Sequence, residues 1–208
     1  MGRPAKFDVD GILDVTAALV ADGGPARATI ANIASRLGAP SGSIYHRFPT
    51  RDLVLARLWI RTVRRAQLGF LDAMTEPDLD LAARQAVLHL PQWTRSHLAE
   101  AKVLLLYRRQ DLADQWPAEL GDELAHLNDG LRDAITNFAR LRFGRATKTT
   151  LTVTRYALVD IPYAGVRSYL AEGHAPPPLL DDLIVTASQA ILNAHPSTRH
   201  QNSSLKAV

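Results

Sequence analysis

The chain has 208 residues, 47% hydrophobic and 22% charged, a composition typical of one or two folded domains that excludes a wholly disordered chain. It contains no cysteine, which excludes disulfides, thiolate nucleophiles and Cys-ligated metal sites. No apolar run approaches the ~18 residues of a membrane span, and no apolar core follows the basic residues at the N-terminus. We therefore expect a cytoplasmic protein that does not enter a membrane.

The net charge of +3 is unevenly distributed along the chain. Residues 1–65 hold ten Lys and Arg against five Asp and Glu, a net of +5, and the other 143 residues hold 14 against 16, a net of −2. A positive excess confined to one segment is typical of a module that binds a polyanion such as nucleic acid. Chance clustering of solvated arginines is the alternative that charge alone leaves open.

The first fifty residues predict three short helices joined by tight turns. Apolar residues recur at helical spacing behind Asp8, a favourable N-cap, and the pattern stops at Gly23. Thr29 is suited to cap a second helix that ends at Gly38. A third, short helix is predicted within residues 41–48.

Long helices are predicted for the rest of the chain, and strand alternation is essentially absent. These helices span residues 51–74, 78–96, 98–114, 118–143, 148–172 and 179–194. The fold class is therefore all-α, an N-terminal three-helix domain joined to a larger helical domain. The predicted domains are residues 1–48, residues 49–196 and a disordered tail at 197–208.

A spacing of four and then six residues separates Ala34, Gly38 and Ile44. A small residue, a turn glycine and an apolar plug at these positions are what two closely crossing helices require. The pattern predicts a helix-turn-helix, whose second helix enters the DNA major groove with its first residues on base edges. Ser41 and Ser43 stand at that end of the helix. A plain helical hairpin with a glycine turn is the alternative.

The segments TIANIASRLG (29–38) and SGSIYHRFPTRDL (41–53) resemble the DNA-binding domain of tetracycline-repressor (TetR) family regulators. The resemblance covers residues 8–58. It implies an all-helical homodimer whose larger C-terminal domain binds a small molecule. It also implies a repressor that the small molecule releases from DNA.

The resemblance assigns DNA contacts residue by residue. Thr29 would cap its helix and touch a phosphate, Tyr45 would contact the backbone, and Arg51 stands where the family commonly has a phosphate-binding Lys. Pro40 departs from the Ser or Thr that the family often has, so Ser41 is a candidate to replace the missing cap. The full set predicted to contact DNA is Arg3, Lys6, Thr29, Ser41, Ser43, Tyr45, His46 and Arg51.

Two of these residues, Arg3 and Lys6, belong to an N-terminal arm. The arm resembles a hook that enters the minor groove, and a role in solubility alone is the alternative.

Residues 78–172 mix bulky apolar side chains with a few polar ones, as ligand pockets do. The resemblance implies a pocket for an unidentified small-molecule effector there. The residues predicted to line it are His89, Trp93, Tyr107, Tyr156 and Asp160. Core aromatics or surface polar groups are the alternative for each of them. Pro162 removes the backbone donor for the Leu158 carbonyl and predicts a kink beside Asp160.

The last predicted helix carries an apolar stripe, and the helix before it adds small residues that permit close approach. Four such helices from two chains would form a two-fold bundle. A terminal helix that covers only its own core is the alternative. The residues predicted at the dimer interface are Ala157, Ala164, Leu180, Leu183, Ile184, Ala187 and Ile191.

Enzyme motifs are not supported by the sequence. Residues 38–42 resemble a nucleophile elbow but have one residue too many before the serine, and no two histidines stand four apart on a helix. We therefore predict no catalytic residue, metal or cofactor, and partners that are double-stranded palindromic DNA, a second copy and an effector. A small-ligand enzyme or a helical adaptor without DNA binding is the alternative.

Overall fold

The computed structural model describes residues 8–106 and 117–195. The arm residues Arg3 and Lys6, the pocket candidate Tyr107, the end of the predicted helix 98–114 and the predicted tail 197–208 lie outside the described residues. All regular structure in the described ranges is helical, with a helix-turn-helix at the N-terminus and a larger helical region after it. The all-α fold class is therefore confirmed.

The chain forms two compact units, each made of two separate stretches of sequence. The first takes the described residues of 1–65 and 97–127, and the second takes those of 66–96 and 128–208. The boundary lies inside a long helix at Arg65, where the sequence suggested a boundary at residue 48. The fourth helix therefore contributes residues 51–65 to the N-terminal unit and residues 66–73 to the second.

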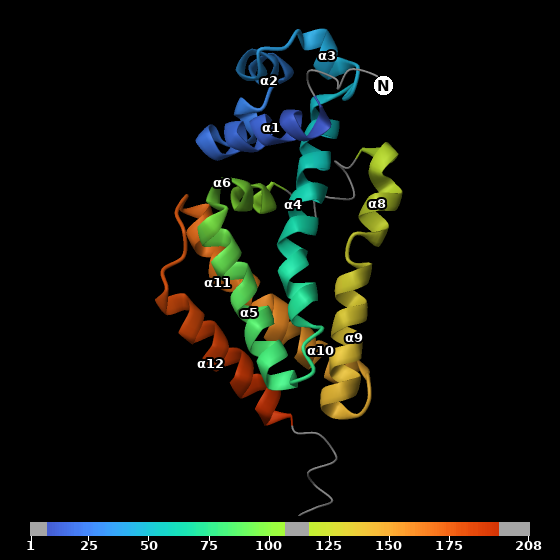
Figure 1. Cartoon of the computed structure of the whole chain (residues 1–208), viewed down its shortest axis with the longest axis vertical. Helices are drawn as coiled ribbons and strands as arrows, with labels where there is room; N and C mark the ends of the chain where they lie inside the picture. The colour runs from blue at the N-terminus through green and yellow to red at the C-terminus, as the bar shows by residue number, and fades with distance from the viewer. Residues whose placement is uncertain (1–7, 107–116, 196–208) are drawn as a thin grey trace, which may run out of the picture. The chain divides into compact units, whose positions relative to one another are not determined.

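The first unit consists of short helices gathered around the start of α4 (Figure 1). Its N-terminal elements are α1 (Val9–Gly23), the 3-10 turn η1 (Pro25–Arg27), α2 (Ile30–Leu37), α3 (Ser41–Tyr45) and residues 51–65 of α4 (Arg51–Ala73). The later segment adds α6 (Leu98–Ala101), the 3-10 turns η2 (Lys102–Leu105) and η3 (Ala118–Leu120), and α8 (Gly121–His126).

Local chemistry explains where the first helices begin and end. The Asp8 carboxylate accepts a hydrogen bond from the Gly11 N–H at 2.8 Å, and the Thr29 hydroxyl accepts one from the Asn32 N–H at 3.1 Å. Gly38 adopts a left-handed φ of 65°, which glycine tolerates without a Cβ penalty. These three residues confirm the predicted caps and turn.

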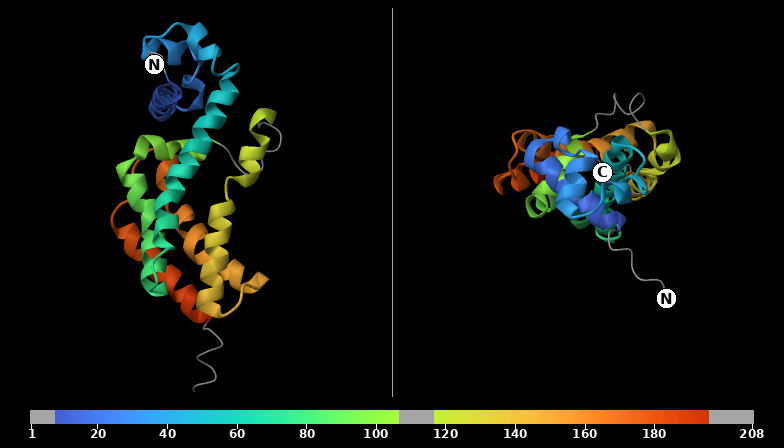
Figure 2. Two further views of the ribbon diagram at one scale, coloured as in Figure 1. Left: turned by 45° about the vertical axis from the view of Figure 1, so that its right-hand side comes forward. Right: turned by 90° about the horizontal axis from the view of Figure 1, so that it is seen from above.

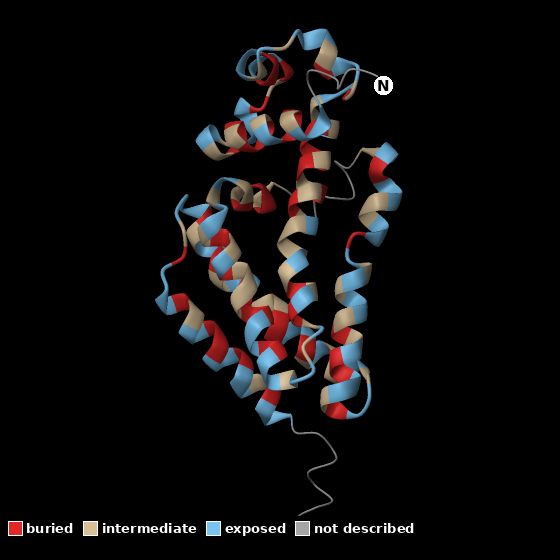
Figure 3. Cartoon of the chain, in the orientation of Figure 1, coloured by how far each residue is buried: buried red, intermediate tan, exposed pale blue. Residues whose placement is uncertain are grey.

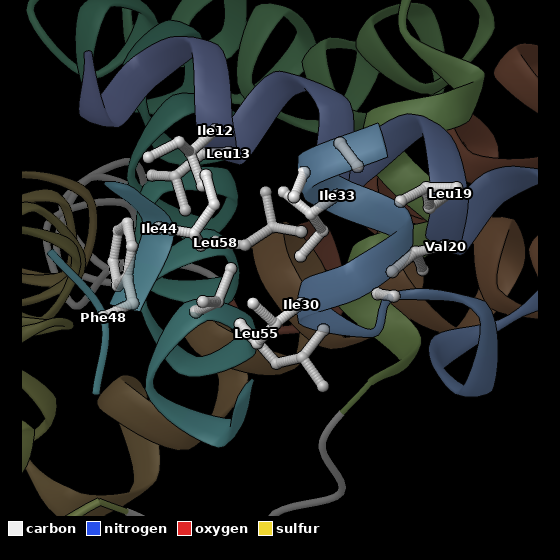
Figure 4. Packing of buried hydrophobic residues seen from close by; sticks show 14 of the residues in the cluster. Ile12, Leu13, Leu19, Val20, Ile30, Ile33, Ile44, Phe48, Leu55 and Leu58 are labelled. Carbon is white, nitrogen blue, oxygen red and sulfur yellow. The ribbon is translucent and has the colours of Figure 1, made fainter. Parts of the chain in front are cut away.

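A continuous apolar core holds the first unit together (Figure 4). Ile12 of α1, Ile33 of α2, Ile44 of α3 and Leu58 of α4 are all fully buried in it. Val103 of η2 is equally buried in the same cluster, although it is 45 residues beyond Leu58 in the chain. Val103 joins η2 to this unit, and a second buried cluster, in which Leu120 and Leu127 pack with Ala56 and Ile60 of α4, joins residues 118–127 to it.

The second unit contains residues 66–73 of α4 and the remaining long helices. Its other elements are α5 (Leu79–Ser96), α9 (Asp129–Phe143), α10 (Lys148–Arg155), the π turn η4 (Tyr156–Asp160), α11 (Ile161–Ala171) and α12 (Leu179–Ala194). In this unit α5 packs against both α11 and α12 (Figure 2). Arg95 of α5 and Asp181 of α12 add two hydrogen bonds, at 2.6 and 3.0 Å.

Three predicted helices differ from the observed elements. The described part of the predicted helix 98–114 consists of the four-residue α6 and the 3-10 turn η2. The predicted helix 118–143 is divided into η3, α8 and α9, with a break at Leu127 and Asn128 where the two units meet in the sequence. The predicted helix 148–172 contains a π turn just before Pro162, in which the Ile161 N–H donates to the Tyr156 carbonyl five residues back. The irregularity expected at Pro162 is therefore a widened helical turn.

In the described ranges, no helix is both long enough and apolar enough to cross a membrane.

Candidate nucleic-acid interface

The α2–α3 turn presents the first residues of α3 at the surface. Pro40 occupies the N-cap position of α3, and no side chain caps this helix. The Ser41 hydroxyl therefore does not act as the cap that the sequence suggested as an alternative. Ile44 is fully buried under α3 and holds the short helix on the core, as the spacing predicted.

The polar side chains of α3 and the turn after it stand away from the core. Ser41, Tyr45 and His46 are exposed, and Ser43 is half-buried. Tyr45 has 53% of its surface exposed, which is high for a large aromatic side chain. A short helix with one buried anchor and an exposed polar face is suited to enter the major groove of DNA.

Thr29 and Arg51 stabilise the backbone beside this face. The Thr29 hydroxyl caps α2, as predicted from the sequence. The Arg51 guanidinium donates hydrogen bonds to the carbonyl oxygens of Pro25, at 2.5 Å, and Ala28, at 3.0 Å. Its third nitrogen lies 3.5 Å from the Asp52 carboxylate. Arg51 thus joins the start of α4 to the α1–α2 turn, and its predicted phosphate contact stays a prediction.

Most arginines of the first unit face carboxylates of the same unit. Arg61 is nearly buried and binds the carboxylates of Asp10, at 3.1 Å, and Asp14, at 2.8 Å, both on α1. The remaining pairs are Arg36 with Asp22 at 2.6 Å, Arg57 with Glu123, Arg64 with Glu123 at 3.2 Å, and Arg65 with Glu100 at 2.9 Å. Of these carboxylates only Glu100 and Glu123 lie outside residues 1–65, so counting them with the segment lowers its net charge from +5 to +3.

His89, a predicted pocket residue, packs between α5 and α4 of the second unit. Its Nε2–H donates to the Ala66 carbonyl at 3.1 Å. A Cβ atom on Gly69 would lie only 2.2 Å from His89 Nδ1, so the ring lies directly on the glycine backbone. Burial lowers the pKa of His89 from its usual 6.5, and the hydrogen bond to Ala66 opposes part of that shift.

The other described pocket candidates differ in how far they are buried. Trp93 is half-buried on α5. Tyr156 is 52% exposed, and the Asp160 carboxylate forms an ion pair with Arg155 at 3.2 Å near the surface. Asp160 itself is half-buried, and the pocket role predicted for Tyr156 and Asp160 stays a prediction.

One residue that the sequence reasoning missed is Thr94 of α5. It is fully buried, and its hydroxyl has no hydrogen-bond partner in the described part of the chain. It follows Val87 and Pro91 on the same buried face of the helix. The only signal in the sequence was a polar residue in register with an apolar stripe, which also fits a hydroxyl bound to its own helix.

Helix α12 has both buried and exposed residues along its length (Figure 3), and the predicted dimer residues divide into two groups by their burial. Ala157, Leu180 and Ile184 are buried inside the protomer, where Leu180 and Ile184 pack on Gly165 of α11. These three positions are corrected from interface to core, because their surfaces are already covered by the same chain. Leu183 is 57% exposed, Ala164 and Ala187 are also exposed, and Ile191 is half-buried.

No group of three or more potential metal ligands lies together in residues 8–106 and 117–195.

The helix-turn-helix segment matches a known protein family. Residues 12–58 match the sequence model of the family described as bacterial regulatory proteins, tetR family. No curated protein sequence matches the chain. The matched residues contain α2, its turn and α3, together with parts of α1 and α4 that form their core.

Solved structures of the same fold cover nearly the whole chain. A transcriptional regulator from Rhodococcus sp. Rha1 has a TM-score of 0.69 at 16% identity, covering 90% of this chain and 97% of that one. The TetR family transcriptional regulator PfmR from Thermus thermophilus has a TM-score of 0.65 at 14% identity, covering 88% and 97%. The transcriptional regulator FadR from Bacillus subtilis, solved in complex with stearoyl-CoA, has a TM-score of 0.59 at 14% identity, covering 91% and 98%.

The helix-turn-helix geometry, the matched N-terminal segment and the shared fold lead to one assignment. Residues 12–58 carry the helix-turn-helix DNA-binding domain of the bacterial tetR family, and the chain as a whole has the fold of solved tetR-family transcription regulators.

Proposed function

We propose that the protein is a one-component transcriptional repressor that binds a palindromic operator as a homodimer and is released by a small-molecule effector. The observation that carries the proposal is the exposed polar face of α3, held on the core by the fully buried Ile44 within the matched domain. Ser41, Ser43 and His46 read base edges in the major groove. Tyr45 and Thr29 contact the phosphate backbone.

The exposed side of α11 and α12 supports the homodimer. Leu179 and Leu183 of α12 are 65% and 57% exposed, and Ala187 continues the same side one turn later. Tyr163 and Ala164 are exposed on α11, which packs beside α12. An exposed apolar surface on two adjacent helices is typical of a protein interface. Two copies of it form a four-helix bundle, and a dimer supplies one recognition helix for each half-site of a palindrome.

The buried hydroxyl of Thr94 supports effector binding in the second unit. A buried hydroxyl without a partner costs about 1–3 kcal/mol unless another molecule satisfies it. A bound effector with a hydrogen-bonding group would supply that partner beside the half-buried Trp93. Because FadR of the same fold binds stearoyl-CoA, acyl-CoA thioesters are the first effector class to test. The effector releases DNA by binding better to a conformation whose half-site spacing misfits the operator.

Operator selection tests the proposed function directly. Genomic fragments retained by the full-length protein are sequenced, and a consensus duplex is compared with a scrambled duplex in fluorescence anisotropy. We expect a palindrome that binds at least about a thousandfold more tightly than scrambled DNA. Equal affinity for both duplexes would refute operator recognition. Expression of a reporter behind the palindrome should fall when the protein is present, and a rise would identify an activator instead.

A Thr94→Val variant tests the effector site. Valine has nearly the same shape but no hydroxyl, so we expect the free energy of unfolding to rise by about 1 kcal/mol in urea titration. Release of operator DNA by an added acyl-CoA should need a higher concentration than in the wild-type protein. Lower stability with unchanged release would show that the hydroxyl serves the fold and not an effector.

A further inference from the structure

The charge pattern of the first unit singles out two arginines. Residues 8–65 contain eight arginines and no lysine. Six of them have a carboxylate of the same unit within 4.0 Å: Arg36, Arg51, Arg57, Arg61, Arg64 and Arg65. In the described ranges, Arg27 and Arg47 have no carboxylate within that distance, so their charges are not compensated locally.

Arg47 lies at the end of the recognition helix α3. One of its terminal nitrogens donates to the Ser43 carbonyl at 3.2 Å, which holds the guanidinium against the backbone of α3. A guanidinium has five N–H donors in a planar fork, so this bond leaves most of them for a phosphate. Arg47 directly follows the exposed His46 in the chain.

Arg27 closes the turn between α1 and α2. A Cβ atom on Gly23 would lie 2.7 Å from Arg27 Cγ, so the aliphatic stem lies over the glycine and the residue remains exposed. The Arg27 carbonyl accepts a hydrogen bond from the Asn32 side chain at 2.8 Å. These contacts fix Arg27 two residues before Thr29, whose hydroxyl caps the positive end of α2.

Arg51 differs from both because its three guanidinium nitrogens all have partners. Two bind the carbonyl oxygens of Pro25 and Ala28, which flank Arg27, and the third faces Asp52. These bonds hold the turn that carries Arg27 beside the start of α4, four residues after Arg47. The bonds of Arg51 therefore fix the turn that carries Arg27 to the start of α4.

We propose that Arg27 and Arg47 are phosphate-binding residues for operator DNA, and that Arg51 is a positioning residue for the Arg27 turn. The proposal rests on the DNA-binding function proposed above. The family resemblance instead predicted that Arg51 itself binds a phosphate.

The salt dependence of operator binding measures the number of phosphates that the protein neutralises. Each one contributes about −0.9 to the slope of log affinity against log salt concentration. With the full-length protein and the selected palindrome, Arg27→Ala and Arg47→Ala should each lower the affinity. Each should also reduce the magnitude of the slope by about 0.9 for every half-site that the residue contacts. Arg36→Ala is the matched control, because Arg36 is paired with Asp22, and its slope should equal that of the wild-type protein.

Two substitutions of Arg51 separate positioning from phosphate binding. Arg51→Lys keeps the charge but lacks the planar fork whose separate nitrogens bind Pro25 and Ala28, so we expect a loss of affinity of about tenfold with an unchanged slope. Near-wild-type affinity of Arg51→Lys would identify Arg51 as a simple phosphate contact. Arg51→Gln removes the charge, and we again expect an unchanged slope. A slope reduced by about 0.9 for each half-site would overturn the positioning role.

The outcomes distinguish this inference from the proposed function. If the wild-type protein shows no preference for any duplex, the proposed function fails and this inference fails with it. If the wild-type protein binds the palindrome while Arg27→Ala and Arg47→Ala retain the wild-type slope, this inference alone is overturned. Circular dichroism melting of each variant checks that a loss of affinity does not come from unfolding.

Discussion

Single contacts between neighbouring helices restrict the size of the side chain that a position can hold. Gly69 and His89 are the sharpest case, because the imidazole ring occupies the space that any side chain at position 69 would need. The ring also binds the Ala66 carbonyl one turn earlier on α4. The α4–α5 contact in the second unit therefore depends on a glycine and a histidine acting together.

A Gly69→Ala substitution tests this dependence. The added methyl group would overlap His89 Nδ1, so we expect the free energy of unfolding to fall by about 1–3 kcal/mol in urea titration. Gly130→Ala is the matched control, since its Cβ would meet only Leu71 at 3.7 Å. It should be neutral or stabilising, because alanine favours a helix over glycine. Removing the ring in a Gly69→Ala, His89→Ala protein should recover part of the loss.

His89 also predicts a pH dependence of stability. Its pKa is lowered in the folded protein, so the unfolded chain binds the proton more readily. The contribution of neutral His89 to the free energy of unfolding is complete above the unfolded pKa of 6.5. It is lost as the pH falls through the lower folded pKa. Urea unfolding from about pH 8 to about pH 5 should show this loss, and His89→Gln should remove that part of the slope. Identical profiles for the two proteins would contradict the assignment.

At the scale of whole elements, the helices differ in how their apolar residues are divided between buried and exposed faces. Helix α12 buries Leu180, Ile184 and Leu192 within the protomer and exposes Leu179 and Leu183 on its other side. The two apolar faces have different roles, one in the core of the protomer and the other in the proposed dimer. Adjacent residues on this helix can therefore be substituted to test each face separately.

Leu183→Asp and Ile184→Asp form a matched pair. Leu183→Asp places a carboxylate on an exposed position, so the protein should stay folded and dissociate to a monomer in analytical ultracentrifugation. Ile184→Asp buries an unpaired carboxylate, and the free energy of unfolding should fall by several kcal/mol. A folded Leu183→Asp dimer that binds the palindrome normally would place the interface elsewhere.

At the scale of the whole molecule, the DNA-binding unit includes a segment that is distant in sequence. Val103 of η2 fills the core made by α1, α2, α3 and α4, and Glu100 of α6 pairs with Arg65. The segment follows α5 directly in the chain, and α5 belongs to the second unit. The chain therefore passes directly from α5 of the second unit into the segment that completes the core of the first unit.

A Val103→Ala substitution tests this organisation. Removing two buried methyl groups should lower the stability of the first unit by about 1–3 kcal/mol and speed hydrogen exchange of the α1 amides. Val87→Ala, an equally buried position on α5, is the control and should speed exchange mainly in the second unit. Protection of α1 that is unaffected by Val103→Ala would show that η2 adds nothing to this core.

The sequence by itself determined the features that depend on near neighbours in the chain. The caps at Asp8 and Thr29, the left-handed turn at Gly38 and the buried plug at Ile44 follow from residue chemistry over a few positions. Together they predicted the helix-turn-helix, and the family resemblance followed from the same residues. Helical periodicity also predicted the all-α class, because apolar spacing is a local signal.

Only the tertiary structure decided which of several equivalent surfaces is buried and which stays exposed. An apolar helix such as α12 has two faces that could enter a core, and packing on Gly165 buries Ile184 while Leu183 stays exposed. Charge alone could not show that Arg51 binds the carbonyls of Pro25 and Ala28, or that Val103 joins the first unit. These contacts join residues more than twenty positions apart, and no local preference specifies which distant groups will meet.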